Sequence, residues 1–510
     1  MLIEFLEAVF VILVALMVAY LVRHYIFTMA VIKNASKNKK AIEIVDDVYQ
    51  PTVSILIPAR NEEKVIRRIL QRMTELTYPK DKLQVTVIND ASTDTTGQIA
   101  EEYSKTYNFI NVVHRSQHEG GRGKASALNT GLKYAKHEII MCFDADYYPQ
   151  RDILEKLTRE FADPKVGAVQ GRVIVLNEPQ NMVTRLVALE RIGGYLVDQN
   201  ARDTLGLIPQ FGGTVGGFRH SLLKSLGGWD ESVLAEDTDL TFRVYLAGHK
   251  IRYINDAECY EEAVENWRAY WRQRYRWAKG HMQCAIKHSF KVLKSSNLSL
   301  KEKIDGLLLL NVYFMPILVM LAWAVGIPLL LLKSSQWLAA LWASVPVFLY
   351  SFVGNFAPFF EVGIGAYLDG RKRAQWLIPL MIFIFVYNMC ICLMAFVDVS
   401  FSKIFRRNGN CWRKTSHSGN GNCYIVNYGN CLKGNDDSES DSNNAYAFSR
   451  SLNIHPHHAS TSTYRAKTAQ RRGAKDNREL RRRAVPPNRS EHPACKHRRG
   501  TVWIKPKNCP

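Results

Sequence analysis

Apolar residues follow two alternating spacings between residues 50 and 145, and each spacing predicts a different element. Short runs rich in Val and Ile, at Val53–Ile57, Val85–Ile88 and Ile139–Phe143, have the length and composition of buried strands. After the first run, apolar residues recur every three or four positions from Val65 to Leu76, as on one face of a helix. Strands that alternate with helices form a mostly parallel sheet covered on both faces, so we expect an α/β fold.

Four much longer apolar runs flank this block. The first covers Phe5–Phe27, and three follow late in the chain at Leu307–Leu332, Trp337–Phe360 and Trp376–Val397. At about 1.5 Å per residue, a helix of this length spans the ~30 Å hydrocarbon core of a bilayer. We therefore predict a transmembrane anchor in residues 1–32 and a bundle of transmembrane helices in residues 300–400, on either side of a polar domain at residues 50–290.

Charged residues beside these runs predict an orientation. Several basic residues lie between Arg23 and Lys40, whereas only Glu4 precedes the first run. By the positive-inside rule, the polar domain lies in the cytoplasm, as part of a multi-pass protein of the plasma membrane. Three complete late crossings would place the basic residues from Lys403 to Arg407 outside the cell. We therefore expect one of the three late runs to be interfacial or re-entrant.

Composition adds a strong positive charge. The 510 residues include 67 Lys and Arg against 47 Asp and Glu, which gives a net charge of +20 at pH 7. Such an excess favours an anionic partner, such as a membrane surface, a nucleic acid or a phosphorylated substrate. Residues 419–510 are rich in Asn, Ser, His and Arg without apolar periodicity, which predicts a disordered basic tail. The ten cysteines lack the spacing of a zinc site, so we expect them to be reduced and structural.

Acidic residues come directly after the predicted strands. Asp90 follows the second strand, and Asp144 and Asp146 follow the third. Because ligands on parallel sheets bind beyond the carboxyl ends of the strands, these carboxylates are expected to share a crevice with Arg60 and Glu62. A divalent cation would offset the repulsion between Asp144 and Asp146, since Mg²⁺ or Mn²⁺ bridges carboxylates to diphosphate oxygens. The alternative is an acidic turn after a strand, without a ligand.

Two further motifs come after the predicted strands. Glu236 and Asp237 stand at the start of a predicted helix, where acidic residues also serve simply to complement the helix dipole. On a later predicted helix, Gln273, Arg276 and Trp277 are spaced to share one face. The alternative for this segment is an amphipathic helix whose arginines contact anionic lipid. That alternative does not require a glutamine and a tryptophan at these positions.

Together the motifs resemble those of family 2 glycosyltransferases of the processive, membrane-embedded kind, which make cellulose, chitin, hyaluronan and poly-N-acetylglucosamine. The matching segments are "SILIPARNEE", "VINDASTD", "FDAD", "AEDTDL" and "QRYRW", in this order within about residues 52–282. The segment "CWRKTSHSG" also resembles one that such synthases carry after their last membrane helices, which predicts a gating segment at residues 401–418. Two positions depart from the family pattern, because Asn89 replaces an aspartate and Ala91 replaces a glycine.

The resemblance implies a GT-A type nucleotide-sugar-binding domain with three groups of functional residues. The nucleotide-binding group would be Pro58, Ala59, Arg60, Glu62, Asp90, Lys124 and Asp144. The catalytic group would be Glu236, Asp237, Gln273, Arg276 and Trp277. Asp144 and Asp146 would hold the Mg²⁺ or Mn²⁺ ion. Within the catalytic group, Asp237 would be the general base, Gln273 and Arg276 would steady the diphosphate, and Trp277 would stack against the acceptor sugar.

We therefore predict an inverting, metal-dependent hexosyltransferase that moves N-acetylglucosamine or glucose from a UDP-sugar to a growing β-linked polysaccharide and couples growth to export. The expected partners are the UDP-sugar, the polysaccharide or a lipid-linked acceptor, the lipid bilayer, and accessory export or regulatory subunits, without nucleic acid. Two alternatives stay open. One is non-processive transfer to a lipid carrier, and the other is a membrane-anchored protein, not an enzyme, that binds anionic polymer through its basic tail.

Overall fold

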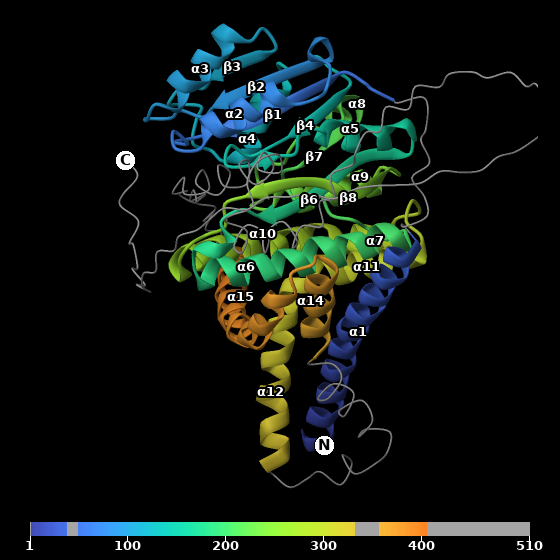
Figure 1. Cartoon of the computed structure of the whole chain (residues 1–510). Helices are drawn as coiled ribbons and strands as arrows, with labels where there is room; N and C mark the ends of the chain where they lie inside the picture. Colours follow the sequence, from blue (N-terminus) through green and yellow to red (C-terminus); the bar gives the residue numbers. More distant parts are fainter. Residues whose placement is uncertain (1, 38–48, 332–355, 405–510) are drawn as a thin grey trace, which may run out of the picture. The chain divides into compact units, whose positions relative to one another are not determined.

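The structure, a computed structural model, describes residues 2–37, 49–331 and 356–404. Its centre is an eight-stranded sheet with the strand order β3-β2-β1-β4-β7-β6-β8-β5 (Figure 1). The first four strands in this order pair in parallel, as the sequence pattern predicted. They are β1 (Val53–Ala59), β2 (Leu83–Asn89), β3 (Ile110–His114) and β4 (Ile139–Cys142). Every residue of β2 and β4 is buried, which explains why β4 is continuously apolar and why the polar Gln84, Thr86 and Asn89 of β2 are also enclosed.

The other half of the sheet is mixed. β7 (Gly216–Arg219) lies antiparallel between β4 and β6 (Val166–Val175). β8 (Lys250–Glu261) pairs in parallel with β6 and antiparallel with the short β5 (Tyr148–Pro149). The sequence pattern did not anticipate the antiparallel β7, because a four-residue strand that begins with two glycines carries little strand signal.

Helices cover both faces of the sheet, and the side chains of β1 alternate between them. Val53, Ile55 and Ile57 pack in one core with α2 (Ile66–Glu75), whereas Leu56 packs in the other with α4 (Lys124–Leu132). The remaining helices of the first face are α3 (Thr96–Thr106) and α5 (Ile153–Thr158), and those of the second include α8 (His220–Ser225) and α9 (Glu236–Leu246). The expected α/β arrangement with two covered faces is therefore confirmed.

A layer of longer helices lies between the sheet and the apolar helices (Figure 1). It contains α6 (Met182–Arg191), α7 (Asn200–Leu205), α10 (Trp267–Lys294) and α11 (Leu300–Leu310). The π-helix η5 (Ile192–Gln199) joins α6 to α7 without a break. Capping supports two of these helices, because the side chains of Asn181 and Ser299 accept hydrogen bonds from the first-turn backbone of α6 and α11.

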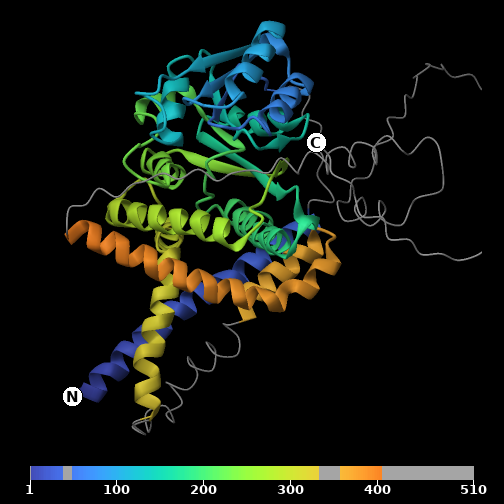
Figure 2. The same cartoon turned by 90° about the vertical axis from the view of Figure 1, so that its left-hand side faces the viewer.

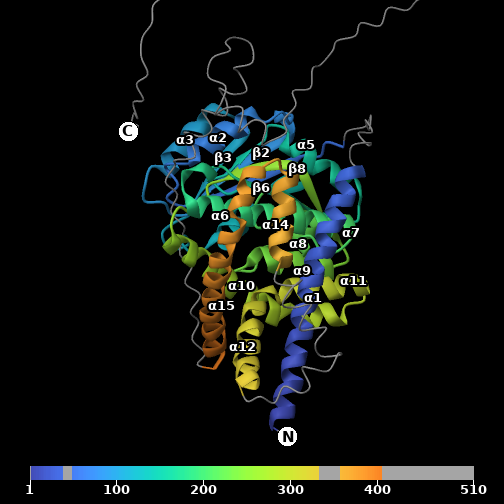
Figure 3. The ribbon, with the colours of Figure 1, turned by 60° about the horizontal axis from the view of Figure 1, so that its bottom comes forward.

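Within the described residues, three segments are long and apolar enough to cross a membrane: Leu2–Asn34, Val312–Leu329 and Lys372–Phe401. The first belongs to α1 (Leu2–Lys37), which contacts α7, α12 (Met315–Leu331) and α14 (Ala357–Leu368), as Figure 3 shows. The predicted run at Trp337–Phe360 falls mostly outside the described residues, as do the basic tail and all but the first residues of the predicted gating segment.

The last apolar helix differs in direction from the other two. α15 (Met381–Ile404) lies along α10, and Figure 2 shows it crosswise to α1 and α12. Polar contacts fix it there, since the Tyr270 hydroxyl of α10 bonds to Asn388 of α15 at 3.2 Å and Lys279 pairs with Asp398 at 3.6 Å. Its length therefore does not by itself make it a third crossing parallel to the others.

Candidate active site

A cavity of about 460 Å³ lies at the carboxyl ends of β1, β2 and β4, below the start of α9. It brings together every residue that the sequence predicted for binding or catalysis. From the strand ends and the start of α4 come Pro58, Ala59, Arg60, Glu62, Asp90, Lys124, Asp144 and Asp146. From the starts of α9 and α10 come Glu236, Asp237, Gln273, Arg276 and Trp277.

Strand register explains how the first group meets. Ala59 of β1 is the register partner of Asn89 of β2, so Arg60 and Asp90 leave the sheet side by side. Leu56 of β1 pairs with Cys142 of β4, which carries Asp144 to the same edge. The pairing of parallel strands therefore places motifs that are far apart in the sequence at one edge of the sheet.

Asp90 lines the part of the cavity that the ends of β1 and β2 form. Its carboxylate is buried, accepts hydrogen bonds from the Gly121 backbone N–H at 3.1 Å, and pairs with the Arg115 guanidinium at 2.5 Å. Arg60 lies beyond, at 3.9 Å from the same carboxylate. Gly121 has φ +77°, a backbone conformation that favours glycine, and its bare Cα leaves room for the Arg60 guanidinium to lie against it.

Lys124 and the two aspartates after β4 form the charged centre of the cavity. The Lys124 ammonium pairs with Asp144 at 2.5 Å. Burial alone would lower the pKa of Lys124, but the nearby Asp144 and Glu236 carboxylates raise it above its usual value. Lys124 is therefore a fixed cation between the strand ends and the start of α9.

The donor set of Asp144 and Asp146 fits Mg²⁺ or Mn²⁺ bound together with a substrate. Among the described residues, no group of three or more His, Cys, Asp or Glu side chains is arranged to hold a metal ion without other ligands. Ions of this kind are commonly held by one or two carboxylates, with substrate phosphates and water as the remaining ligands. Asp144 and Asp146 are separated by one residue and line the same cavity, which matches that mode.

The end of β8 holds residues that the sequence analysis missed. Glu261 accepts hydrogen bonds from Arg191 at 2.5 and 3.0 Å and from the Tyr147 hydroxyl at 2.6 Å. Glu262 pairs with Arg68 at 2.6 Å, and Arg68 also donates to the carbonyl oxygen of Asp146. These contacts fix the loop that carries Asp146, although nothing in the local sequence marks β8 as its support.

The acidic pair at the start of α9 lies in the first turn of the helix, where it complements the helix dipole, and it lines the cavity. Asp237 accepts a hydrogen bond from the backbone N–H of its neighbour Thr238 at 2.7 Å, whereas the N-cap residue Ala235 forms no side-chain cap. A Cβ added to Gly213, on the facing loop, would lie 3.3 Å from the Asp237 carboxylate, so this glycine keeps the carboxylate accessible. Burial, with the charge of Asp237, raises the pKa of Glu236 to about 7.

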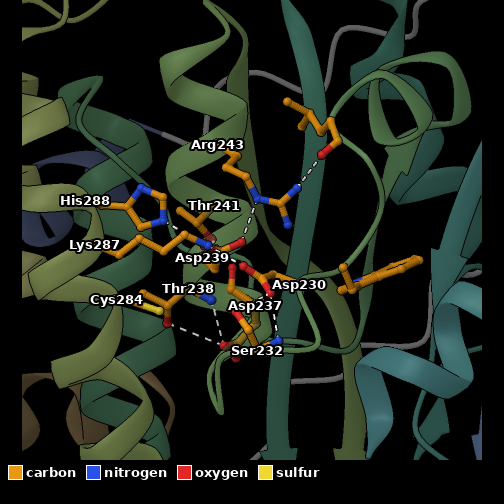
Figure 4. A network of polar contacts seen from close by, with 12 residues as sticks. Asp230, Ser232, Asp237, Thr238, Asp239, Thr241, Arg243, Cys284, Lys287 and His288 are labelled. Atoms are coloured by element: carbon orange, nitrogen blue, oxygen red, sulfur yellow. Dashed lines mark hydrogen bonds and ion pairs between the residues drawn. The ribbon is translucent and has the colours of Figure 1, made fainter. Parts of the chain in front are cut away.

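A buried network locks α9 to α10 (Figure 4). Asp239 accepts hydrogen bonds from Arg243 at 2.6 Å, from Lys287 at 2.6 Å and from His288 at 2.7 Å. Burial alone would raise the pKa of Asp239, but the hydrogen bonds from His288 and Lys287 lower it well below its usual range. Because Lys287 and His288 belong to α10, this network fixes the helix that carries Asp237 against the helix that carries Trp277.

Cations surround the ring of Trp277. The guanidinium of Arg274 lies 4.2 Å from the ring centre and that of Arg191 lies 5.1 Å from it, both within cation–π range. Arg274 is in turn paired with Glu190 at 2.6 Å. Burial lowers the pKa of Arg276, which lines the cavity one residue before Trp277. This arrangement presents an oriented aromatic ring and a positive charge to the cavity.

Strained backbone marks the rim of the cavity. Three residues other than glycine have positive φ there, a backbone conformation that such residues rarely adopt. They are Asn61, Ala91 and Val215, with φ values of +54°, +54° and +55°. Ala91 is the position at which the family pattern has glycine, and its conformation gives the physical reason for that preference. Asn61 is supported by hydrogen bonds, since its side-chain oxygen accepts from the Thr93 backbone N–H at 2.8 Å.

Comparison with known proteins agrees with this geometry. Residues 51–280 match the family model described as "Glycosyltransferase like family 2". The probable glycosyltransferase YdaM of Bacillus subtilis is 42% identical over 238 residues, which cover 46% of this chain and 57% of that protein. A β-monoglucosyldiacylglycerol synthase of Nostoc sp. is 36% identical over 267 residues, which cover 52% of this chain and 56% of that protein.

A more distant relative acts on a polymer. The poly-β-1,6-N-acetyl-D-glucosamine synthase of Staphylococcus epidermidis is 30% identical over 249 residues, which cover 49% of this chain and 59% of that protein. The chain therefore spans less than two thirds of the length of each of these relatives. The sheet and its covering helices are the GT-A-like fold of the family.

Proposed function

We propose that this chain, whose residues 51–280 form a family 2 glycosyltransferase domain, transfers N-acetylglucosamine or glucose from a UDP-sugar to a growing β-linked polysaccharide. The observation that carries this proposal is the meeting of Asp90, Asp146 and Asp237 in one cavity with Trp277. These residues come from four separate motifs, and a nucleotide sugar with its acceptor needs all four kinds of contact.

In this proposal the two ends of the donor are held by different elements. Asp90 and Arg60 bind the uridine at the ends of β1 and β2. Lys124 and Arg276 bind the diphosphate and stabilise the charge that develops on it as the sugar leaves. Both cations are buried or partly buried, which strengthens their interaction with a developing negative charge.

Asp237 is proposed to act as the general base. It takes the proton from the acceptor hydroxyl, which then attacks the anomeric carbon on the face opposite UDP. This single displacement inverts the configuration, so an α-linked donor gives a β-linkage, in agreement with the inverting chemistry of family 2. A positioned carboxylate contributes about 10²–10⁴-fold as a general base. Glu236, with its pKa raised to about 7, would keep the local negative charge low until the donor binds.

Asp144 and Asp146 would hold Mg²⁺ or Mn²⁺. Such an ion, when bound, supplies positive charge that stabilises the leaving diphosphate. Asp144 is also the partner of Lys124, so an ion held by Asp144 would add its positive charge to that of this lysine. Arg68 positions the Asp146 backbone through its carbonyl oxygen.

The names of the relatives suggest two kinds of acceptor for this chain, diacylglycerol and a polysaccharide. The lining of the cavity toward α1 favours the polysaccharide, since Asp198, Gln199, Arg202 and Gln210 present polar groups there. The hydrocarbon chains of a diacylglycerol would need an apolar slot instead. Trp277 adds a flat aromatic face, on which a sugar ring can stack.

We propose that the domain faces the cytoplasm, where UDP-sugars are made, and that α1 and α12 cross the plasma membrane. α15 would lie in the membrane interface, with one face against α10 and the other in lipid. Its exposed apolar residues, such as Phe383, Phe385 and Met394, support this placement. If the predicted run at Trp337–Phe360 returns the chain across the membrane, an interfacial α15 leaves two late crossings and keeps the basic residues after it in the cytoplasm. Export of the polymer would then take place beside α1 and α12, with or without accessory subunits.

The test is to incubate membranes that contain the chain with radiolabelled UDP-N-acetylglucosamine or UDP-glucose and to determine the size of the product. We expect a polymer from one of the two donors. A single sugar attached to lipid would favour the glycolipid alternative, and no transfer from either donor would refute the proposed function. Asp237→Asn should retain donor binding and lose transfer. Deletion of residues 420–510 should retain turnover, whereas a protein that acts by binding polymer through its tail would lose its activity.

A further inference from the structure

The cavity extends past the catalytic residues to a second group of polar side chains, here called the membrane-side end. This end is formed by Arg23 of α1, Gly194, Tyr195 and Asp198 of η5, and Arg202 of α7. None of these residues belongs to a motif identified in the sequence. No role in donor binding or catalysis was assigned to them above, so their presence beside the proposed acceptor position needs an explanation of its own.

Arg23 is unusual because it is a buried charge within a helix that is apolar enough to cross a membrane. It is 7% exposed, and among the described residues its Nε and Nη1 atoms have no hydrogen-bond partner. Its guanidinium lies 5.7 Å from the Tyr20 ring centre and 5.3 Å from the Phe27 ring centre, within cation–π range, and its charge also interacts with the Asp198 and Glu361 carboxylates. A charged residue in such a helix commonly marks a ligand or transport path.

Asp198, in η5, provides a second and independent indication of a ligand. Its Oδ1 atom is buried and makes no hydrogen bond within the described part of the chain, and it lies 3.6 Å from Arg202. The residue belongs to a π-helix, a conformation that occurs frequently at functional sites. In the same element, a Cβ added to Gly194 would meet no atom within 4 Å, so the backbone of η5 is open at this position.

The charges of this end indicate which ligand it accepts. Arg23 and Arg202 supply two positive charges, while Asp198 and Asp305, which pairs with Arg202 at 2.5 Å, supply two negative charges. The nearby His24 and Glu361 satisfy each other as a pair. A phosphate would gain from Arg23 but would be repelled by Asp198. A ligand with hydroxyl groups can accept from Arg23 and donate to Asp198 at the same time.

We propose that Arg23, Asp198 and the open backbone at Gly194 form a subsite for an uncharged, hydroxyl-rich sugar unit of the acceptor chain, beyond the unit that receives the new sugar. This inference rests on the proposed function and deepens it, because it assigns a neutral oligosaccharide as the ligand of this end. Such a subsite would retain the growing chain between additions. A diacylglycerol acceptor, which has a single hydroxyl group, would not use it.

The test uses the full chain in detergent or membranes, with the donor that supports transfer. Transfer is measured to a monosaccharide and to a β-linked trisaccharide of the donor's own sugar. The wild type should have a lower KM for the trisaccharide. Arg23→Gln and Asp198→Asn should each raise the KM for the trisaccharide about tenfold or more, because each removes a charge-assisted hydrogen bond to the longer acceptor. The KM for the monosaccharide should change far less.

Two further variants keep the test decisive. Gly194→Leu breaks no ion pair and fills the open side of η5, so it should abolish the preference for the trisaccharide even if the charge variants fold poorly. Arg67→Gln is the matched control, because Arg67 forms an exposed pair with Glu102 away from the cavity and should leave both KM values unchanged.

The outcomes separate this inference from the proposed function. Transfer with the same ratio of the two KM values in wild type, Arg23→Gln and Gly194→Leu would overturn the subsite and leave the glycosyltransferase intact. A variant effect on a diacylglycerol acceptor but not on the trisaccharide would also overturn it. No transfer by the wild type from either donor to either acceptor would overturn the proposed function, and the subsite with it.

Discussion

The two ends of the cavity are built by different means. At the sheet end, Arg60, Asp90 and Asp144 each follow a strand by one or two residues, and the hydrogen-bond ladder of β1, β2 and β4 sets their spacing. At the helix end, the side chains come from α1, η5, α9 and α10, which share no ladder. Buried ion pairs hold the helices around this end together, such as those of Asp239 in α9 with α10 and of Arg202 in α7 with Asp305 in α11.

This difference predicts how substitutions at each end affect the stability of the protein. A ladder of backbone hydrogen bonds does not depend on any one side chain, so the strand register at the sheet end should survive isosteric changes in the carboxylates of Asp144 and Asp146, whereas Asp90 also forms a buried pair with Arg115. Helices held by buried ion pairs depend on those charges, because removal of one partner leaves the other buried and uncompensated. Substitutions at the two ends should therefore separate loss of chemistry from loss of structure.

The largest effect on stability is expected at the helix end. Asp239→Asn should lower the free energy of unfolding by about 3 kcal/mol, because Lys287, His288 and Arg243 lose a buried carboxylate. Denaturant unfolding of the purified protein measures this. The matched control is Asp256→Asn, whose exposed pair with Arg159 should be worth less than about 0.5 kcal/mol. Equal effects of the two variants would show that the network does not hold α9 to α10.

At the sheet end we expect a large loss of activity with little change in stability. Asp146→Asn should reduce kcat/KM by about 10²-fold or more, since it removes a proposed metal ligand and charge stabilisation of the leaving group. The remaining activity should not respond to added Mn²⁺. The unfolding free energy should change by less than about 1 kcal/mol, because the Asp146 backbone contact with Arg68 is retained. A normal metal response in this variant would contradict the ligand assignment.

The same difference explains what could be predicted from the sequence. Each motif of the sheet end lies within a few residues of its strand, so a correct strand prediction is enough to place Arg60, Asp90 and Asp144 together. Gln273, Arg276 and Trp277 could be grouped because they share one helical face. Their placement opposite the strand ends was available only through the resemblance to a family, because it depends on how α10 packs.

The rest of the site could not be found in this way. Arg23 reaches the cavity only because α1 packs against α7 and η5, which lie far along the chain. The π-helical conformation of η5 has no local sequence signal, and the preceding capping residues of α6 predict an ordinary helix. Glu261 and Glu262 follow a long strand of mixed polarity that the apolar pattern did not single out. Tertiary packing, rather than local preference, decides these positions.

A smaller effect is expected where the two ends meet, at the start of α9. Burial and Asp237 raise the pKa of Glu236 to about 7, so the folded protein binds this proton more tightly than the unfolded chain does. Stability should therefore fall as pH rises from about 4.5 to above 7, the window between the ordinary and the raised pKa. Glu236→Gln should remove that loss and be more stable than wild type by roughly 2 kcal/mol at pH 8.

The measurement for Glu236 is unfolding of the ligand-free protein at pH 5 and pH 8. The gain from Glu236→Gln should be small at pH 5, because the wild-type side chain is then largely protonated. Glu102→Gln, on the exposed pair with Arg67, is the control and should show little difference between the two pH values. The same stability gain at both pH values would mean that packing, and not the proton, accounts for the effect.

The smallest effect tests the backbone of the sheet end. Ala91 has φ +54°, a left-handed conformation that costs a residue with a Cβ about 1 kcal/mol or more and costs glycine little. Ala91→Gly should therefore stabilise the protein by about 0.5 kcal/mol, after the greater freedom of glycine in the unfolded chain is subtracted. Ala100→Gly, in the buried part of α3, should instead destabilise it by about 1 kcal/mol. A higher melting temperature for Ala91→Gly and a lower one for Ala100→Gly would confirm that the backbone at Ala91 is strained. Loss of stability in both variants would show that the loop after β2 prefers alanine for its packing.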